Sequence, residues 1–492
     1  MKKILLLIIL GTVIPVLFMA FTPKEKSFTP ADEYIVIAWN DLGMHCANLD
    51  FQNLCILPPY NNQMAQVILK GAIPTLMSAS SGIYVTYQIP GNTYSVGKTN
   101  FWTYANTLFG VTLAPNVGLA GFGLTGTMTA TDTYHHAEGI PITAYRDATP
   151  SSNPDPYQLL LVQAFSSGSQ FLDSTTVVIP VSHEINCVSS GCHSSEMNIL
   201  NMHETVPGFD PNNRPILCAN CHGDPALGKP KLPGYDYFSQ VIHRKHGSFI
   251  NTGTISDCYK CHPGPNTQCL RDYMHTIGKI CQDCHGSVSN VGSTIAGGRI
   301  PWVQEPSCGN SGCHDANHSE PAGQLYRQSK GHGGIYCSAC HGSPHAIQPT
   351  NTDHPRDNYQ NIALQGFSGP LKKCEVCHGY IPSGPGPHGY NPTGIEPVNA
   401  NIPLNNEILQ NYPNPASRMT HIPFHISSGG AVSLTVYNIH GEKVQTLVNK
   451  NLQPGEYNVE LYTEKIPTGT YICCLEVNGG KYCEKIAVVK DF

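Results

Sequence analysis

The chain has 492 residues, a formal net charge of -6 and 13% charged residues, about half the usual charged share. Its 47 glycines and 39 prolines indicate many turns and argue against a helical bundle or a coiled coil. The acidic balance argues against a nucleic-acid-binding protein, which needs a basic face. Twenty cysteines are too many for an ordinary cytosolic enzyme. The length suits three modest domains better than one.

Residues 1–25 have the pattern of a secretory signal peptide. Lys2 and Lys3 precede an apolar run from Ile4 to Phe21. The run is about the minimum length for spanning a membrane, and no basic cluster follows it. A retained membrane anchor is the alternative. We expect removal on export, and hence no stable transmembrane segment in the mature protein.

Residues 30–182 are predicted to form an N-terminal β-sandwich. Short runs rich in β-branched and aromatic residues recur here, separated by clusters of Gly, Pro, Asn and Ser, and this pattern is typical of such a domain. The runs lie at residues 34–37, 66–69, 84–89, 127–131, 159–164 and 175–181.

The loop after the first predicted strand contains the only two cysteines of this domain, Cys46 and Cys55. We expect them to form a disulfide. The alternative for this loop is a ligand role for His45 toward a metal or a cofactor. Further along, His135 and His136 are predicted to lie in a loop.

Residues 183–380 contain seven motifs in which two cysteines are followed directly by a histidine. Five have two residues between the cysteines and two have four. Such a motif suits covalent haem, because two thiols add to the two vinyl groups and the adjacent histidine reaches the iron. The sequence therefore predicts seven haem c groups, attached at Cys187, Cys192 and His193; Cys218, Cys221 and His222; Cys258, Cys261 and His262; Cys281, Cys284 and His285; Cys308, Cys313 and His314; Cys337, Cys340 and His341; and Cys374, Cys377 and His378.

Two other uses of these cysteines are zinc knuckles and seven disulfides. Neither requires a histidine after every second cysteine. With 23 histidines in 492 residues, seven such histidines by chance have a probability on the order of 10⁻⁹. The motifs lie so close together between Cys187 and His378 that we expect the haems to pack nearly in contact and to pass electrons by hopping.

The second axial ligand decides between an electron carrier and an enzyme, because an iron with histidine on both faces has no open position for a substrate. No motif has lysine in place of histidine, which lowers the case for an enzyme. Ten histidines outside the motifs are candidates: His183, His203, His243, His246, His275, His318, His332, His345, His354 and His388. We predict seven of them as distal ligands, namely His203, His243, His246, His275, His332, His345 and His388. Three methionines are weaker candidates, namely Met197, Met202 and Met274.

The closely spaced motifs, with His332, the Cys337–His341 motif and His345 at their centre, resemble those of the extracellular multihaem c-type cytochromes. The resemblance covers residues 183 to about 390. Some members of that group are surface electron conduits, and some polymerise into filaments. The resemblance implies extracellular electron transfer and does not choose between conduit and filament.

Residues 381–405 are rich in Pro, Gly and Asn and are predicted to be a linker. Residues 406–492 again have strand patterns and predict a second, smaller β-sandwich. Five segments are similar to the C-terminal sorting domain of type IX secretion substrates: Asn411–Pro415, Leu434–Ile439, Gly441–Val444, Leu452–Tyr457 and Pro467–Tyr471. That resemblance implies export through the outer membrane by the type IX machinery, often followed by cleavage of the domain. An ordinary immunoglobulin-like module is the alternative.

The C-terminal domain also contains Cys473, Cys474 and Cys483. If Asn478 and Gly479 form a two-residue turn, Cys474 and Cys483 face each other across a hairpin and can form a disulfide. A register shift of one residue would prevent this bond.

Together these features predict mainly β flanking domains around a multihaem cytochrome c domain with little secondary structure. The predicted protein is secreted or held at the cell surface and carries electrons between mostly bis-histidine haems. Its partners would be other cytochromes, extracellular electron acceptors or copies of itself in a filament. The alternative is an extracellular terminal reductase with one open haem that acts on a small oxyanion or a similar acceptor.

Overall fold

The computed structural model describes residues 33–147, 153–309, 313–348, 355–379, 382, 386–389, 406–409, 411, 414–416, 419–452, 455–463 and 465–490. The predicted signal peptide at 1–25 and almost all of the predicted linker at 381–405 lie outside these residues. Among the described residues, no helix is long and apolar enough to cross a membrane.

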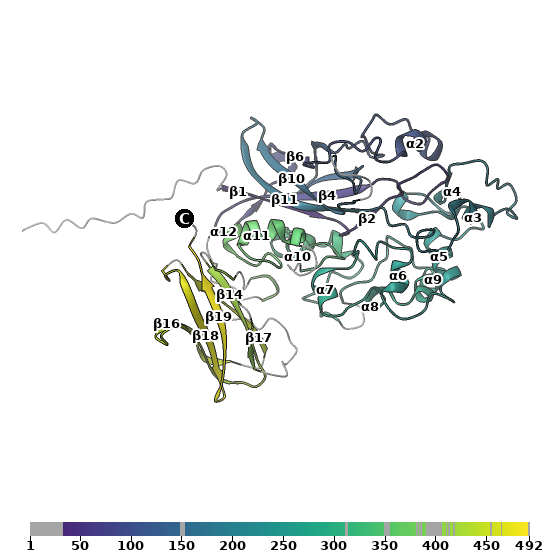
Figure 1. The fold of residues 1–492 in the computed structure, drawn as a ribbon. Helices are drawn as coiled ribbons and strands as arrows, with labels where there is room; N and C mark the ends of the chain where they lie inside the picture. Colours follow the sequence, from purple (N-terminus) through teal and green to yellow (C-terminus); the bar gives the residue numbers. More distant parts are fainter. Residues whose placement is uncertain are drawn as a thin grey trace, which may run out of the picture.

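The N-terminal part is a β-sandwich of two sheets (Figure 1). The first sheet has the strand order β1 (Tyr34–Asn40), β4 (Asn61–Leu69), β9 (His135–Ile140) and β8 (Thr129–Ala130), with β5 (Thr75–Leu76) beside β4. The second has the order β2 (His45–Cys46), β11 (Phe171–Ser182), β10 (Tyr157–Ser166), β6 (Ile83–Gln88) and β7 (Thr125–Thr127). Alternate residues of each strand face the space between the sheets, where Val36, Val67, Val85, Leu160 and Ile179 are buried.

Each of the six predicted strand runs lies wholly or partly in a strand of this sandwich. The prediction of a loop at His135 and His136 is wrong, because both residues lie in β9. Their segment has few β-branched residues, but β4 and β8 pair with it on either side, so tertiary pairing overrides the weak local preference. The helix α2 (Phe101–Phe109) was not predicted, and its apolar face packs against Phe51 and Cys55.

The central part consists of short helices joined by long turns. They are α3 (Glu196–Asn201), α4 (Ala219–His222), α5 (Phe238–His246), α6 (Ser256–Tyr259), α7 (Asp272–Thr276), α8 (Cys281–His285), α9 (Val288–Ala296), α10 (Cys337–His341), α11 (Tyr359–Gln365) and α12 (Glu375–His378). Single 3-10 turns occur at Ala79–Ser81, Pro225–Leu227, Tyr326–Gln328, His332–Gly334, Pro355–Asn358 and Pro387–Gly389.

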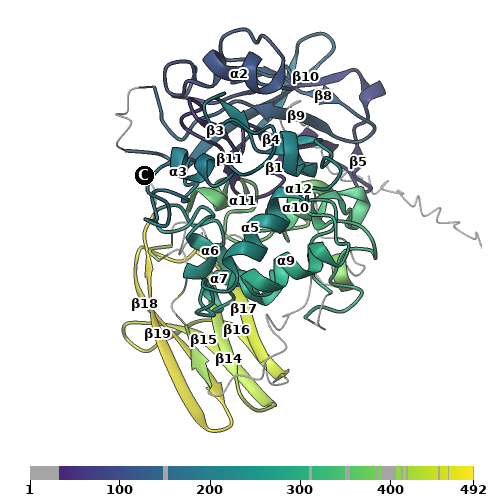
Figure 2. The same ribbon diagram turned by 90° about the vertical axis from the view of Figure 1, so that its right-hand side faces the viewer.

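The central part packs directly on the N-terminal sandwich (Figure 2). Ala339 of α10 and Val376 of α12 join an apolar cluster with Ile37 and Trp39 of β1. Parallel pairing of β12 (Ile216–Leu217) with β3 (Leu54–Cys55) adds a second connection. The outer face of the sandwich therefore supports the segments that contain the cysteine motifs.

A buried arginine also joins the two parts. Arg271 is 0% exposed, and its guanidinium donates to both carboxylate oxygens of Asp357, at 2.6 and 2.8 Å. It also donates to the carbonyl oxygen of Gly43 at 2.6 Å and lies 5.0 Å from the ring centre of Tyr157. One side chain thus connects two parts of the central segment with the N-terminal domain.

The C-terminal part is a second, smaller β-sandwich (Figures 1 and 2). One sheet contains β13 (Glu407–Ile408), β14 (Met419–Ile426) and β17 (Gly455–Tyr462). The other has the order β16 (Lys443–Leu452), β15 (Gly430–Asn438), β18 (Gly469–Val477) and β19 (Gly480–Val488). Phe424, Leu434, Leu475 and Ile486 are buried between the sheets.

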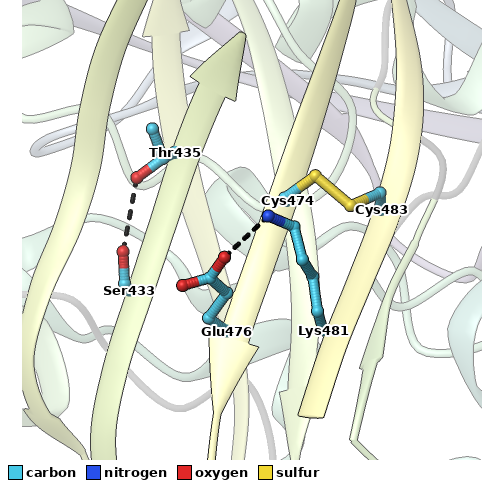
Figure 3. The surroundings of a disulfide bond; sticks show 6 residues. All are labelled: Ser433, Thr435, Cys474, Glu476, Lys481 and Cys483. Carbon is cyan, nitrogen blue, oxygen red and sulfur yellow. Dashed lines mark hydrogen bonds and ion pairs between the residues drawn. A yellow bond between two sulfur atoms is a disulfide. The ribbon is translucent and has the colours of Figure 1, made fainter. Parts of the chain in front are cut away.

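The predicted turn and disulfide of this domain are confirmed. Asn478 and Gly479 have positive φ angles of 50° and 81°, as a type I′ hairpin turn requires. The register sets Cys474 opposite Cys483, and the two cysteines form a disulfide. Two residues nearer the turn, Glu476 and Lys481 form an ion pair on the same hairpin (Figure 3).

Replacing both Cys474 and Cys483 by serine is expected to lower the free energy of unfolding of the C-terminal domain by about 2 to 3 kcal/mol, because a closed loop is lost from the unfolded chain. Hydrogen exchange in β18 and β19 of the full chain measures the change. A thiol reductant should have the same effect on the wild-type domain and none on the double variant. Equal exchange in the two proteins would contradict the prediction.

The C-terminal sandwich contacts the central part through a small apolar contact. The ring centres of Phe367 and His421 lie 4.3 Å apart at an angle of 70°, which is an edge-to-face arrangement. Both residues are buried, and the positive charge of Lys372 lies 5.5 Å from the centre of the same phenyl ring. Phe367 lies seven residues before Cys374, where the last cysteine motif begins. The C-terminal sandwich therefore contacts the chain close to that motif.

Candidate functional site

Each short motif closes into a single helical turn. The backbone N–H of the motif histidine donates to the carbonyl oxygen of the first cysteine, at 3.2 Å for His222 and at 2.9 Å for both His262 and His378. The other two short motifs form the helices α8 and α10. This turn brings two thiols and one imidazole to a single place, as the sequence spacing predicts.

The longer motif at Cys187 closes with the same hydrogen bond. The N–H of His193 donates to the carbonyl oxygen of Cys187 at 3.1 Å, although two more residues lie between the cysteines. Gly191 takes a positive φ of 77°, which a glycine adopts without strain. The extra residues therefore do not prevent closure. The other long motif, Cys308 to His314, includes residues 310–312, which lie outside the described part.

All fourteen motif cysteines are free thiols in this structure. Within the described ranges, no group of three or more His, Cys, Asp or Glu side chains is arranged to hold a metal ion by itself. The prediction of a Cys46–Cys55 disulfide is wrong, because both of these cysteines are also free. The reason is topological: Cys46 pairs with Ser182 in β11, whereas Cys55 pairs with Leu217 in β12.

Six of the seven motif histidines face a histidine from outside the motifs. In each case the centres of the two imidazole rings lie close to 6 Å apart. The pairs are His193 with His246 at 6.1 Å, His222 with His203 at 6.2 Å, His262 with His243 at 6.1 Å, His285 with His345 at 6.3 Å, His341 with His388 at 5.9 Å and His378 with His332 at 6.0 Å.

This separation suits two imidazoles on opposite sides of one iron. A metal–nitrogen bond of about 2 Å on each side, plus about 1 Å from each nitrogen to its ring centre, puts the centres about 6 Å apart. Direct stacking of two rings needs no such constant separation. The residues present therefore fit a haem with two histidine ligands at each of these six places.

Backbone carbonyl groups orient the imidazoles of these pairs. The Nδ1 atom of His243 lies 2.7 Å from the carbonyl oxygen of Ser239, and the Nδ1 atom of His246 lies 2.8 Å from that of Ile242. The same contact occurs at four more histidines, namely His345 with Leu42 at 2.9 Å, His388 with Asn317 at 2.6 Å, His203 with Ile199 at 3.2 Å and His378 with Ala72 at 3.3 Å. A proton on Nδ1 leaves the lone pair of Nε2 for a metal.

The surroundings also keep two of these histidines neutral. Burial, together with a smaller effect of the neighbouring His388 and His285, respectively, lowers the pKa of His341 and of His345 to about 4. Neutral imidazole is the form that binds a metal. Both histidines are thus ready to act as ligands at neutral pH.

Other histidines differ in their hydrogen bonds. His183 uses both ring nitrogens, with Nδ1 3.0 Å from the carbonyl oxygen of Ala47 and Nε2 accepting from the N–H of Ala144 at 3.2 Å. His45 has Nε2 2.6 Å from a carboxylate oxygen of Asp41. Neither has the arrangement seen in the six pairs, which argues against the ligand role considered for His45.

Three further histidines complete the set of ten candidates. His275 lies on α7, and His354 lies outside the described residues. The ring of His318 lies 5.1 Å from that of His388, and its Nδ1 lies 2.7 Å from Asp315. The predicted roles of His275 and His314 stay predictions.

Sequence reasoning missed the contribution of the N-terminal domain. The carbonyl groups of Leu42 and Ala72 orient His345 and His378 across about three hundred residues. Backbone carbonyl groups have no residue-type signal, so no sequence pattern could have revealed them.

Residues 410–489 match the family described as "Secretion system C-terminal sorting domain". A type IX sorting domain is therefore present, and the protein is exported to the cell surface or the extracellular space by the corresponding secretion machinery. No curated protein matches the chain.

Three solved structures are similar to this chain at low TM-scores, so none of them indicates its fold. A conjugative transposon lipoprotein from Bacteroides eggerthii is 10% identical, with 18% of this chain and 98% of that chain covered and a TM-score of 0.14. An endo-β-1,4-mannanase from Thermotoga petrophila is 14% identical, with 19% of this chain and 21% of that chain covered and a TM-score of 0.13. Dimeric latent PorU from Porphyromonas gingivalis is 9% identical, with 93% of this chain and 34% of that chain covered and a TM-score of 0.15.

Proposed function

We propose that the protein is a secreted multihaem c-type cytochrome that carries electrons between closely packed haems. The observation that supports this most strongly is the pairing of six motif histidines with six other histidines, all near 6 Å between ring centres. All six of these distal partners belong to the seven predicted from the sequence.

The chain's own residues have three roles in this proposal. Fourteen cysteines hold seven haem c groups by thioether bonds, the motif histidines are the proximal ligands, and the second histidine of each pair closes the opposite face of the iron. When bound, each haem supplies an iron that accepts and releases one electron. A second histidine at each of the six paired sites would keep substrates away from the iron, which favours a carrier over an enzyme.

Export determines the kind of partner. The sorting domain takes the protein out of the cell, so it exchanges electrons with other exported cytochromes, extracellular acceptors or further copies of itself. An exported terminal reductase with one open haem is the competing proposal.

One experiment tests the proposal. The mature protein is weighed by mass spectrometry to count the attached haems, and the dithionite-reduced spectrum is recorded with and without carbon monoxide. We expect seven haems and an unchanged Soret band. A shift in about one-seventh of the Soret intensity would indicate one open haem. This outcome would contradict the electron carrier and favour the terminal reductase. A mass without haem would overturn both proposals.

A further inference from the structure

We infer that the six described histidine pairs form one continuous electron path with its two ends on opposite sides of the molecule. The order is His222, His193, His262, His285, His341 and His378, with each site named by its motif histidine. This inference rests on the proposed function and adds to it the sequence of sites and the two places where electrons enter and leave. Four sets of contacts define the order.

The first step joins the sites of His222 and His193. The distal partner of His222 is His203, which follows His193 after the two-turn helix α3. One short segment therefore supplies the proximal ligand of one site and the distal ligand of the next. The backbone N–H of His203 donates to the carbonyl oxygen of Leu200 at 3.0 Å, which continues the helical path up to that histidine.

The second step joins His193 to His262. Their distal partners, His246 and His243, are three residues apart on α5. Residues at that spacing lie on the same face of a helix, about 5–6 Å apart. Asn186, just before the first motif, strengthens this connection, because its side chain donates to the carbonyl oxygens of Tyr259 and His262 at 3.1 and 3.3 Å.

The third step joins His262 to His285. The motif of His285 begins at Cys281, at the start of α8. The side chain of Gln282, next in the chain, donates to the carbonyl oxygen of Thr254 at 2.5 Å. Thr254 lies four residues before Cys258, so this contact holds the start of one motif close to the start of the other.

The last steps use one segment of fourteen residues, from His332 to His345. Its middle is the motif that ends at His341, its last residue faces His285, and its first residue faces His378. The backbone N–H of Leu371 donates to the carbonyl oxygen of Cys340 at 2.9 Å, which brings the last motif beside this one. Three sites are thus connected in the order His285, His341 and His378.

The two end sites lie far apart. Figure 1 shows α4, with His222, near one side of the molecule and α12, with His378, toward the other, while α6, α8 and α10 lie between them. An exposed apolar side chain lies beside each end, Met202 next to His203 at 68% and Ile73 next to Ala72 at 87% exposure. Small apolar contacts of this kind suit the weak, transient complexes of electron-transfer proteins.

The direct test is the arrangement of iron atoms in the wild-type holoprotein, determined by electron cryomicroscopy. We expect the irons at His222 and His378 to be the most distant pair of the six, with the other four between them in the stated order. Contact between the two end haems, or a different order of neighbours, would overturn the path. A protein without haem would instead overturn the proposed function.

Kinetics test the direction of travel with a matched pair of variants. His332→Met gives the last site a methionine ligand, which raises its potential and marks its spectrum. A photosensitiser is attached at Met202→Cys in one protein and at Ile73→Cys in the other. We expect the marked haem to be reduced without delay from position 73 and with a lag from position 202. If electrons from positions 73 and 202 reached the marked haem equally fast, the proposed order of sites would be wrong.

Discussion

Under the proposed function, replacing His246 by alanine is expected to open one iron while the other five described histidine pairs stay intact. The imidazole of His246 lies 6.1 Å from that of His193, and alanine cannot reach across that gap. Carbon monoxide should then shift about one-seventh of the reduced Soret intensity. A difference spectrum of the variant against the wild-type protein measures this change.

His183→Ala is the matched control for this variant. Its imidazole is largely enclosed and held at both nitrogens by the backbone of Ala47 and Ala144, so its loss should leave the carbon monoxide spectrum unchanged. A shift in the control, or no shift in His246→Ala with all seven haems attached, would contradict the assignment of His246. Haem counts by mass spectrometry show that both variants have matured fully.

Arg271→Met is expected to lower the free energy of unfolding by about 3 to 5 kcal/mol, because it leaves the buried carboxylate of Asp357 without its partner. The side chains of the pair are 0% and 3% exposed. The variant also removes the contact with the carbonyl oxygen of Gly43. Urea unfolding of the holoprotein, followed by the haem absorption and by tryptophan fluorescence, measures the loss.

Arg356→Ala provides the comparison from the neighbouring part of the chain. Arg356 also forms an ion pair, with Asp155 at 2.6 Å, but its side chain is 43% exposed. Its loss should cost about 1 kcal/mol or less. The double variant Arg271→Met with Asp357→Leu should be more stable than Arg271→Met alone, since the carboxylate of Asp357 is no longer buried without its partner. Equal losses in Arg271→Met and Arg356→Ala would contradict the role assigned to the buried pair.

The features that could be predicted from the sequence are local ones. The turn that joins Cys218 to His222 depends on five consecutive residues, so its spacing alone indicates the geometry. The hairpin at Asn478 and Gly479 is equally local, and its register follows from the turn type. The strands of the N-terminal sandwich could be recognised wherever β-branched residues cluster, as in β1 and β11.

The features that could not be predicted depend on contacts between distant segments. His345 faces His285 across sixty residues, and the choice among ten candidate histidines depends on how the short helices pack. Cys46 and Cys55 are close in sequence, but their strands pair with different partners. Strand β9 begins with two histidines and gains its structure from its neighbours. In each case tertiary packing outweighs the local signal.

If the sorting domain is cleaved off, the contact between Phe367 and His421 makes the product differ from the precursor in its surface as well as in its length. While the sorting domain is attached, Phe367 is only 5% exposed. Proteolytic release of that domain would uncover the phenyl ring of Phe367 beside the last cysteine motif. An antibody raised against this newly exposed patch would therefore distinguish molecules still in transit from those that have arrived outside the cell.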